Sequence, residues 1–74
     1  MKYYYIIQCT NRDDTNCNKY AATNESDDTY TTNYNHMLIF DSRKLAKQDI
    51  KEYGDETIER VSRISEAELM TYLL

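Results

Sequence analysis

The chain has 74 residues, a formal net charge of −4 and 41% hydrophobic residues, and it contains eight tyrosines. This length supports one small domain over residues 1–74 with a thin core, and the acidity argues against non-specific nucleic-acid binding, which needs a basic surface. The apolar runs at 3–7 and 37–40 are too short to cross a membrane, and residues 2–8 do not resemble an export signal, so we expect a cytoplasmic protein.

The first expected element is a strand over residues 2–9. Its aromatic and β-branched side chains suit a pleated, half-buried surface. Alternation places Tyr3, Tyr5 and Ile7 on one face and residues 4, 6 and 8 on the other. Since both faces are largely apolar, we expect this strand in the middle of a sheet.

Residues 10–35 form a polar, loop-rich segment. Asn, Asp, Thr and Ser dominate residues 10–16 and 24–28, which is loop and turn composition. Between them, residues 17–23 read either as a short strand with Tyr20 and Ala22 directed inward or as one helical turn.

Residues 29–40 alternate in the manner of a strand. The second half, residues 36–40, is apolar on both faces, so we expect it to be the buried part. The first half is typical of a hairpin arm or a sheet edge.

A helix is expected over residues 42–53, because Asp41 and Ser42 supply N-cap side chains. Its apolar stripe recurs at helical spacing and consists of Leu45, Ala46, Asp49, Ile50 and Tyr53. Gly54 stands where a left-handed residue commonly ends a helix.

Residues 57–64 fit a strand or a helix. The pattern Ser65-Glu66-Ala67-Glu68 is a capping box, in which Ser65 accepts a hydrogen bond from the Glu68 amide. A helix that starts at residue 66 favours a strand before it, and the terminal helix over 66–73 should bury Leu69, Met70 and Leu73. We therefore predict an α+β fold, a three- to four-stranded and mostly antiparallel sheet packed on the 42–53 helix, with a short C-terminal helix.

Two cysteines and one histidine are the candidate reactive groups. In the cytoplasm Cys9 and Cys17 are expected to be reduced thiols, although a disulfide between them is the alternative. With His36 they supply three ligands where structural zinc takes four. We expect no metal and no cofactor.

The candidate partner-binding residues combine acids with tyrosines. The loop acids follow neither the spacing nor the glycine of an EF-hand, so solvation or contact with a partner explains them. Tyrosine is enriched at interfaces because it offers a large contact area at low entropic cost. The candidates are Asp13, Asp14, Tyr20, Glu25, Asp27, Asp28, Tyr30 and Tyr34. Such a surface fits a basic partner, for example a nucleic-acid-binding groove in which carboxylates replace phosphates.

Size, acidity and the order of segments also carry a resemblance. The segments are Lys2-Tyr3-Tyr4-Tyr5-Ile6-Ile7, Leu38-Ile39-Phe40-Asp41-Ser42 before a capped helix, and Val61-Ser62-Arg63-Ile64-Ser65-Glu66. With this layout the chain resembles the small accessory proteins of phages and prophages, among them anti-CRISPR proteins. The resemblance implies an inhibitor that binds a host or defence protein in the host cytoplasm, and it assigns no functional residue.

Three hypotheses follow for the function. The first is a non-enzymatic protein-binding module that acts through the acidic, Tyr-bearing surface. The second is a small regulatory or structural subunit that pairs with itself through a sheet edge, as a homodimer. The third is a small enzyme that uses His36 and a cysteine.

Overall fold

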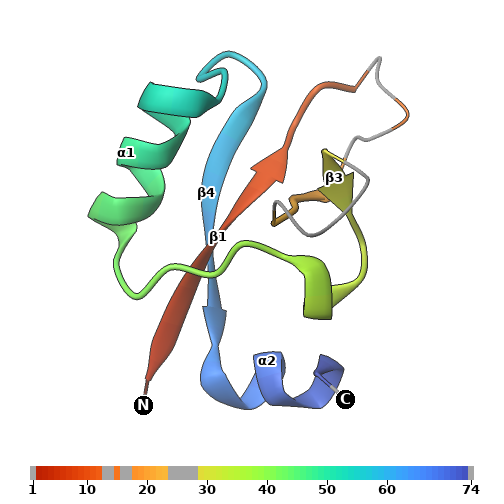
Figure 1. Cartoon of the computed structure of the whole chain (residues 1–74). Helices are drawn as coiled ribbons and strands as arrows, with labels where there is room; N and C mark the ends of the chain where they lie inside the picture. The colour runs from red at the N-terminus through yellow and green to blue at the C-terminus, as the bar shows by residue number, and fades with distance from the viewer. Residues whose placement is uncertain (1, 13–14, 16–17, 24–28, 74) are drawn as a thin grey trace.

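The computed structural model describes residues 2–12, 15, 18–23 and 29–73. Its elements are β1 (Tyr3–Cys9), β2 (Tyr20–Ala21), β3 (Tyr30–Thr31), the 3-10 turn η1 (Tyr34–His36), α1 (Arg43–Tyr53), β4 (Glu59–Ser65) and α2 (Glu66–Tyr72) (Figure 1). The strands form one antiparallel sheet in the order β3-β2-β1-β4. The expected α+β fold is therefore confirmed.

Strand β1 lies inside the sheet, as its two apolar faces predicted. It pairs with β4 over its whole length, from Tyr3 opposite Ser65 to Cys9 opposite Glu59. On its other side it meets β2 at Gln8, opposite Tyr20, and the isolated bridge partner Phe40. The pairing with β4 also decides the ambiguous 57–64 stretch in favour of the strand from Glu59 onward, while residues 57 and 58 belong to the turn before it.

The two faces of β1 contribute to two separate hydrophobic cores. Ile6 packs with Met37, Ile64 and Leu69 on the face covered by α2. Its neighbour Ile7 packs with Ala21, Ala46 and Ile50 on the face covered by α1. The sheet therefore carries one helix on each face, where the sequence placed only the 42–53 helix against it.

Helix α1 begins as expected, because the Ser42 Oγ accepts a hydrogen bond from the Leu45 amide at 3.2 Å. The expected apolar stripe is partly wrong. Ala46 and Ile50 are buried, whereas Leu45 is 51% and Tyr53 82% exposed. At 3.6 residues per turn, Ala46 and Ile50 lie about 100° and about 140° around the helix axis from Leu45. Because Ala46 and Ile50 face the sheet, the Leu45 side chain lies at the border of the helix–sheet contact and is partly in solvent.

Gly54 follows α1, but its backbone is extended rather than left-handed, with φ −110° and ψ −162°. The expectation of a left-handed cap is therefore wrong. A Cβ at this position would clash with the Glu59 Oε1 and would lie 3.1 Å from the Ile50 Cα. Glycine is needed here for a close approach of side chain and backbone.

The 29–40 stretch is not one continuous strand. The Thr31 Oγ1 accepts from the Asn33 amide at 2.9 Å, and the Asn33 Oδ1 accepts from the Asn35 amide at 3.0 Å. These local hydrogen bonds compete with a sheet ladder and end β3 at Thr31. Beyond η1 the chain makes isolated bridges at Met37 and Phe40.

The expected burial of residues 36–40 is correspondingly limited. Met37 is buried, whereas His36 is exposed and Ile39 is 36% exposed. Earlier in the chain, the strand alternative for 17–23 holds for two residues, and Ala21 is the buried one where Ala22 was expected. Asn18 precedes this strand with φ 70°, a left-handed conformation that asparagine tolerates well.

Helix α2 starts at the predicted cap, where the Ser65 Oγ accepts from the Glu68 amide at 3.1 Å. Leu69 is buried and Leu73 packs against the same core. Met70 was expected inside but is 64% exposed, because a helix that touches the sheet along one narrow side leaves the position after Leu69 in solvent.

Candidate functional site

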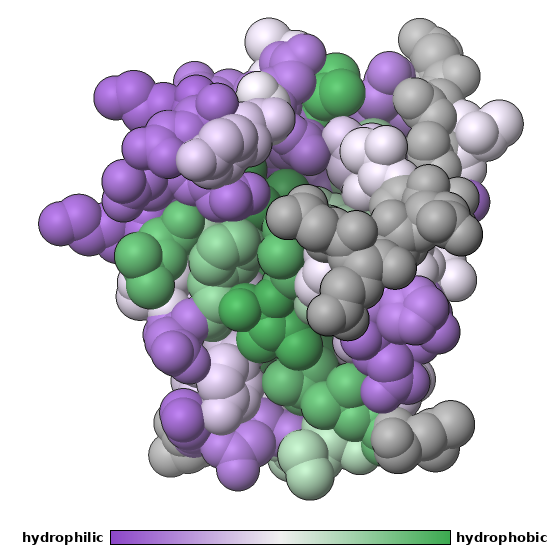
Figure 2. All heavy atoms as spheres, viewed as in Figure 1, coloured by the Kyte–Doolittle hydropathy of each residue, from purple (hydrophilic) through white to green (hydrophobic). Residues whose placement is uncertain are grey.

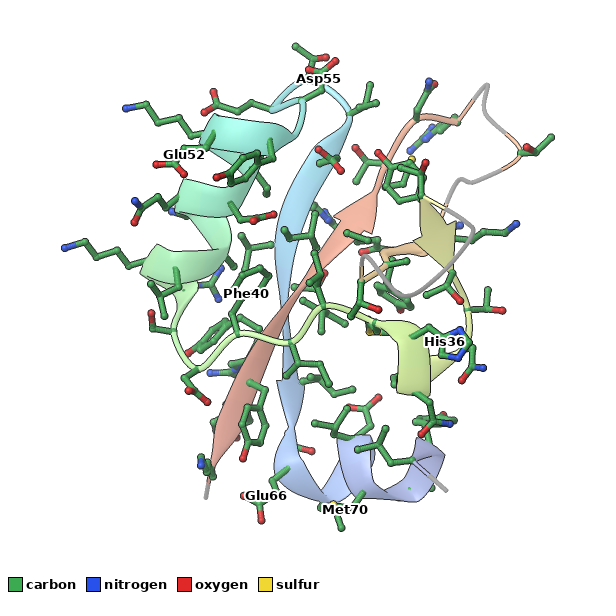
Figure 3. The ribbon with its side chains drawn as sticks, in the orientation of Figure 1. His36, Phe40, Glu52, Asp55, Glu66 and Met70 are labelled. Atoms are coloured by element: carbon green, nitrogen blue, oxygen red, sulfur yellow. The ribbon has the colours of Figure 1, made fainter. Side chains whose placement is uncertain are left out.

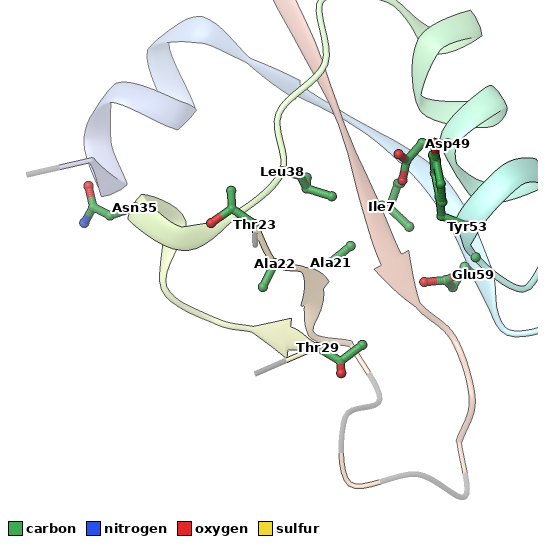
Figure 4. Close-up of a pocket in the computed structure, with 11 residues that line it drawn as sticks. Ile7, Ala21, Ala22, Thr23, Thr29, Asn35, Leu38, Asp49, Tyr53 and Glu59 are labelled. Carbon is green, nitrogen blue, oxygen red and sulfur yellow. The ribbon is translucent and has the colours of Figure 1, made fainter. Parts of the chain in front are cut away.

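An open groove of about 880 Å³ lies beside α1 on the face of the sheet that this helix covers (Figure 4). Its floor is apolar and consists of Ile7, Ala21 and Leu38. Helix α1 packs chiefly over β1 and β4. Among the described residues, α1 therefore leaves the β2 side of this face uncovered, and the groove forms there.

The walls of the groove differ in chemistry. One wall carries Asp49, Tyr53 and Gly54 from the end of α1, together with Glu59 of β4. The opposite wall is uncharged and consists of Ala22, Thr23, Thr29 and Asn35. The groove therefore offers an apolar floor with carboxylates along one side.

Glu59 is held rigidly in this wall. Its Oε2 accepts from the Tyr30 hydroxyl at 2.9 Å, and its Oε1 accepts from the Asp55 amide at 2.6 Å. The first bond joins β4 to β3 across the sheet. Tyr30, predicted as a partner anchor, thus directs its hydroxyl to a carboxylate of the groove.

Asp49 projects from α1 into the same groove and is half-buried. Burial raises the pKa of its carboxyl, and the neighbouring carboxylates of Glu59 and Glu52 raise this pKa further. The charged form of Asp49 is therefore disfavoured in the free protein.

The end of α1 and the turn after it form an exposed acidic surface, here named the α1 acidic end. Glu52 and Asp55 lie at this end of the helix in Figure 3, and both are exposed. The Thr57 hydroxyl and amide donate to Asp55 at 2.6 and 2.9 Å and lower its pKa. The surface comprises Asp49, Glu52, Tyr53, Asp55 and Glu56.

Sequence reasoning missed the α1 acidic end because it assigned Tyr53 to the core. A usable signal was present, since residues 49–59 contain five acids and one base, Lys51. In Figure 2 hydrophilic side chains cover this part of α1, and an apolar band runs below it over the 37–40 segment toward α2. Within the 37–40 segment, Ile39 is 36% exposed.

Tyr20 and Tyr34, the other predicted anchors in the described chain, lie on the opposite face. Their ring centroids are 6.0 Å apart, and Tyr34 stacks on Tyr72 at 4.5 Å. Both pack against the core under α2. Burial, with a contribution from Tyr20, raises the pKa of Tyr34 to about 12. These rings join the sheet to α2 and are not grouped with Tyr30.

The five predicted loop acids lie outside the described residues. They are Asp13, Asp14, Glu25, Asp27 and Asp28. Of the predicted site residues that the structure describes, Tyr30 is linked to the groove through its hydrogen bond to Glu59, and Tyr20 and Tyr34 are not.

The two described candidates for reactive groups, Cys9 and His36, differ in their exposure to solvent. Cys9 is 0% exposed, so a substrate cannot reach its sulfur in this conformation. His36 is exposed in η1, and Cys17 lies outside the described residues. Within the described ranges, no three His, Cys, Asp or Glu side chains are grouped so that they could hold a metal ion.

Neither helix in the part of the chain that the structure describes is long and apolar enough to span a bilayer. Comparisons with models of protein families, with curated proteins and with solved structures give no match.

Proposed function

We propose that the protein is a non-catalytic protein-binding module whose contact surface is the α1 acidic end and the adjoining groove. The observation that carries the proposal is Tyr53, which is 82% exposed and borders an apolar groove. Binding energy at interfaces comes mainly from a few large side chains, with tyrosine among the most frequent. A ring in this position supplies such an anchor.

The charge around Tyr53 supports a basic partner. Glu52, Asp55 and Glu56 are exposed beside it, and exposed charges of one sign accelerate encounter with a surface of the other sign. A partner cation near Asp49 would also favour the charged carboxylate that burial disfavours in the free protein. We therefore expect the partner to carry a Lys or Arg side chain that reaches Asp49 in the groove wall.

The finer part of the proposal is that the protein is a phage-encoded inhibitor, of the anti-CRISPR kind or similar, which occupies a basic nucleic-acid-binding groove of a host or defence protein. The resemblance to phage accessory proteins and the acidic surface support it. The part of Asp13, Asp14, Glu25, Asp27 and Asp28 in binding stays a prediction, since these acids lie outside the described residues.

Affinity capture tests the proposal, with the parent chain and a Tyr53→Ala chain as parallel baits in a lysate of the source cell. A partner enriched by the parent is then measured by surface plasmon resonance. Tyr53→Ala should raise the dissociation rate, because the anchor is lost, and leave the melting temperature unchanged, because the ring is exposed. Leu45→Ala on the same helix is the control and should change neither the association rate nor the dissociation rate.

The charge component has its own matched pair of variants. Glu52→Gln/Glu56→Gln should slow association and flatten its salt dependence. Glu66→Gln/Glu68→Gln removes two exposed charges from α2 and should leave the association rate and its salt dependence unchanged. Equal effects of the two double variants would show that only net charge matters, and the proposed contact surface would then be wrong.

A further inference from the structure

Strand β4 (Glu59–Ser65) is an outer strand of the sheet, with β1 on one side. It is seven residues long, whereas the outer strand at the other end, β3, has two. A long outer strand presents a row of backbone groups that another strand can pair with. In the described chain, β4 is therefore the edge best suited to extend the sheet.

The register shows which residues of β4 direct their backbone outward. The Glu66 amide donates to the Lys2 carbonyl at 2.9 Å, and the Thr10 amide donates to the Ile58 carbonyl at 2.6 Å. In an antiparallel pair, bonded and non-bonded positions alternate along the strand. Even-numbered residues of β4 therefore bond to β1, and Val61 and Arg63 turn their amide and carbonyl groups outward.

The odd-numbered residues of β4 also share one face, in the order acid, apolar residue, base. These are Glu59, Val61 and Arg63, followed by Ser65 at the end of the strand. We propose that this edge pairs with β4 of a second copy of the chain, antiparallel about a two-fold axis at Val61. In this register each Glu59 lies opposite the partner's Arg63, and the two valines face each other. Within its own chain the Glu59 amide donates to the Asp55 carbonyl at 3.0 Å and its carboxylate accepts from Tyr30 and Asp55, so the Glu59 carbonyl is left for strand pairing and the partner's Arg63 is a third donor to the carboxylate. Unlike charges directly opposite stabilise a strand pair.

Neighbouring symmetric registers are less favourable. An axis at Arg63 places two arginines opposite each other, and like charges in that position destabilise. An axis at Ser62 places Val61 opposite the partner's Arg63 and forms no pair of unlike charges. The charge order of β4 therefore selects the axis at Val61.

The surroundings of Val61 fit a second strand. A cleft of about 280 Å³ lies between α1 and β4 and is lined partly by Ile50 and Val61. A strand added beside β4 lies along this cleft and covers its apolar side chains. Arg60 and Arg63 are exposed. The Arg63 guanidinium lies 4.2 Å from the centroid of the Tyr3 ring of its own chain, so this side chain turns from Tyr3 to reach the partner's Glu59, whereas the buried core residues keep their places.

The dimer edge does not include Tyr53, but it shares Glu59 with the groove wall, and the cleft beside it is lined by Glu56 of the α1 acidic end; its test is therefore the oligomeric state of the chain alone and not partner binding. The dimer joins two four-stranded sheets into one and places two α1 acidic ends on a single particle. A partner with two basic sites would then bind with higher apparent affinity than a single chain allows.

Sedimentation equilibrium of the full chain tests the inference, at concentrations up to roughly millimolar, where weak strand pairing is populated. The parent should show a monomer–dimer equilibrium. Arg63→Glu places like charges opposite each other twice and should raise the dimer dissociation constant about tenfold or more. Arg60→Glu makes the same charge change on the other face of β4, opposite the partner's Ser62, and should leave the constant within about twofold.

A mixing experiment separates pairing from misfolding. Glu59→Lys and Arg63→Glu chains should each be monomeric alone and should form a heterodimer when mixed, because unlike charges then oppose each other at both positions. Far-UV circular dichroism checks folding, since Glu59 also accepts from Tyr30 and Asp55. A monomeric parent, equal loss with Arg60→Glu, or no heterodimer on mixing would each overturn the inference. A stable dimer that Arg63→Glu leaves intact would place the interface elsewhere.

Discussion

Ile50 and Leu45 lie on the same helix and were both expected in its apolar stripe, yet only Ile50 should matter for stability. Ile50 is 5% exposed and packs with Ile7, Ala21 and Ala46. Ile50→Ala removes three carbon atoms, at about 0.8 kcal/mol each, and leaves a cavity, so the expected loss is about 2–5 kcal/mol.

That loss is large for a chain of this size. At roughly 0.05–0.15 kcal/mol per residue, 74 residues correspond to about 4–11 kcal/mol of unfolding free energy. Ile50→Ala should therefore be largely unfolded at 37 °C if the parent lies near the lower end. Leu45 is 51% exposed, and Leu45→Ala should change the unfolding free energy by less than about 1 kcal/mol.

Urea unfolding followed by circular dichroism at 222 nm measures both variants against the parent, with the slope checked for two-state behaviour. Lys47→Ala, also exposed on α1, is the matched control and should be near neutral. Equal unfolding midpoints for Ile50→Ala and Leu45→Ala would refute the rotation of α1 and the core assignment that rests on it.

Further predictions concern titration and capping. The pKa of the Asp49 carboxyl is raised in the folded protein. Asp49 therefore contributes to stability at a pH below its pKa in the unfolded chain, and this contribution is lost as the pH rises through its pKa in the folded protein. Asp49→Asn should raise the melting temperature at pH 7 and not at pH 3. Tyr34, with its pKa at about 12, stabilises the fold below pH 10 and loses this contribution between pH 10 and 12, so urea unfolding of Tyr34→Phe should show a weaker decline over that range; an identical decline would contradict the assignment. Ser65→Ala removes the cap of α2 and should cost about 1 kcal/mol in urea unfolding, whereas Thr32→Ala, at an exposed position after β3, should change the unfolding free energy by less than about 0.5 kcal/mol.

The candidate site shows where sequence reasoning stops. The sequence shows that the chain is acidic and rich in tyrosine, but it does not show which of the eight tyrosines is exposed at the candidate site. Tyr53 was assigned to the core because its spacing from Ile50 fits a helical stripe, and the structure leaves its ring in solvent at the open β2 side. Tyr34 was chosen as an anchor and instead stacks on Tyr72. Which ring meets solvent depends on what covers each face.

The sequence alone determined the elements whose causes are local. Strand β1 follows from its aliphatic and aromatic run, and the starts of α1 and α2 follow from Ser42 and Ser65, each bonded to an amide three residues later. That second cap also implied the strand before it. Each of these depends on groups only a few positions apart, so a pattern in the chain suffices to specify it.

Only the tertiary structure decided how the elements meet. The rotation of α1 that buries Ala46 and exposes Leu45, the docking of α2 on the face opposite α1, and the bond between Tyr30 and Glu59 all join residues distant in sequence or depend on such contacts. A helical stripe more than about 100° wide allows several rotations, and the packing of its neighbours selects one of them. The groove exists for the same reason, because α1 covers β1 and β4 and leaves the side next to β2 open.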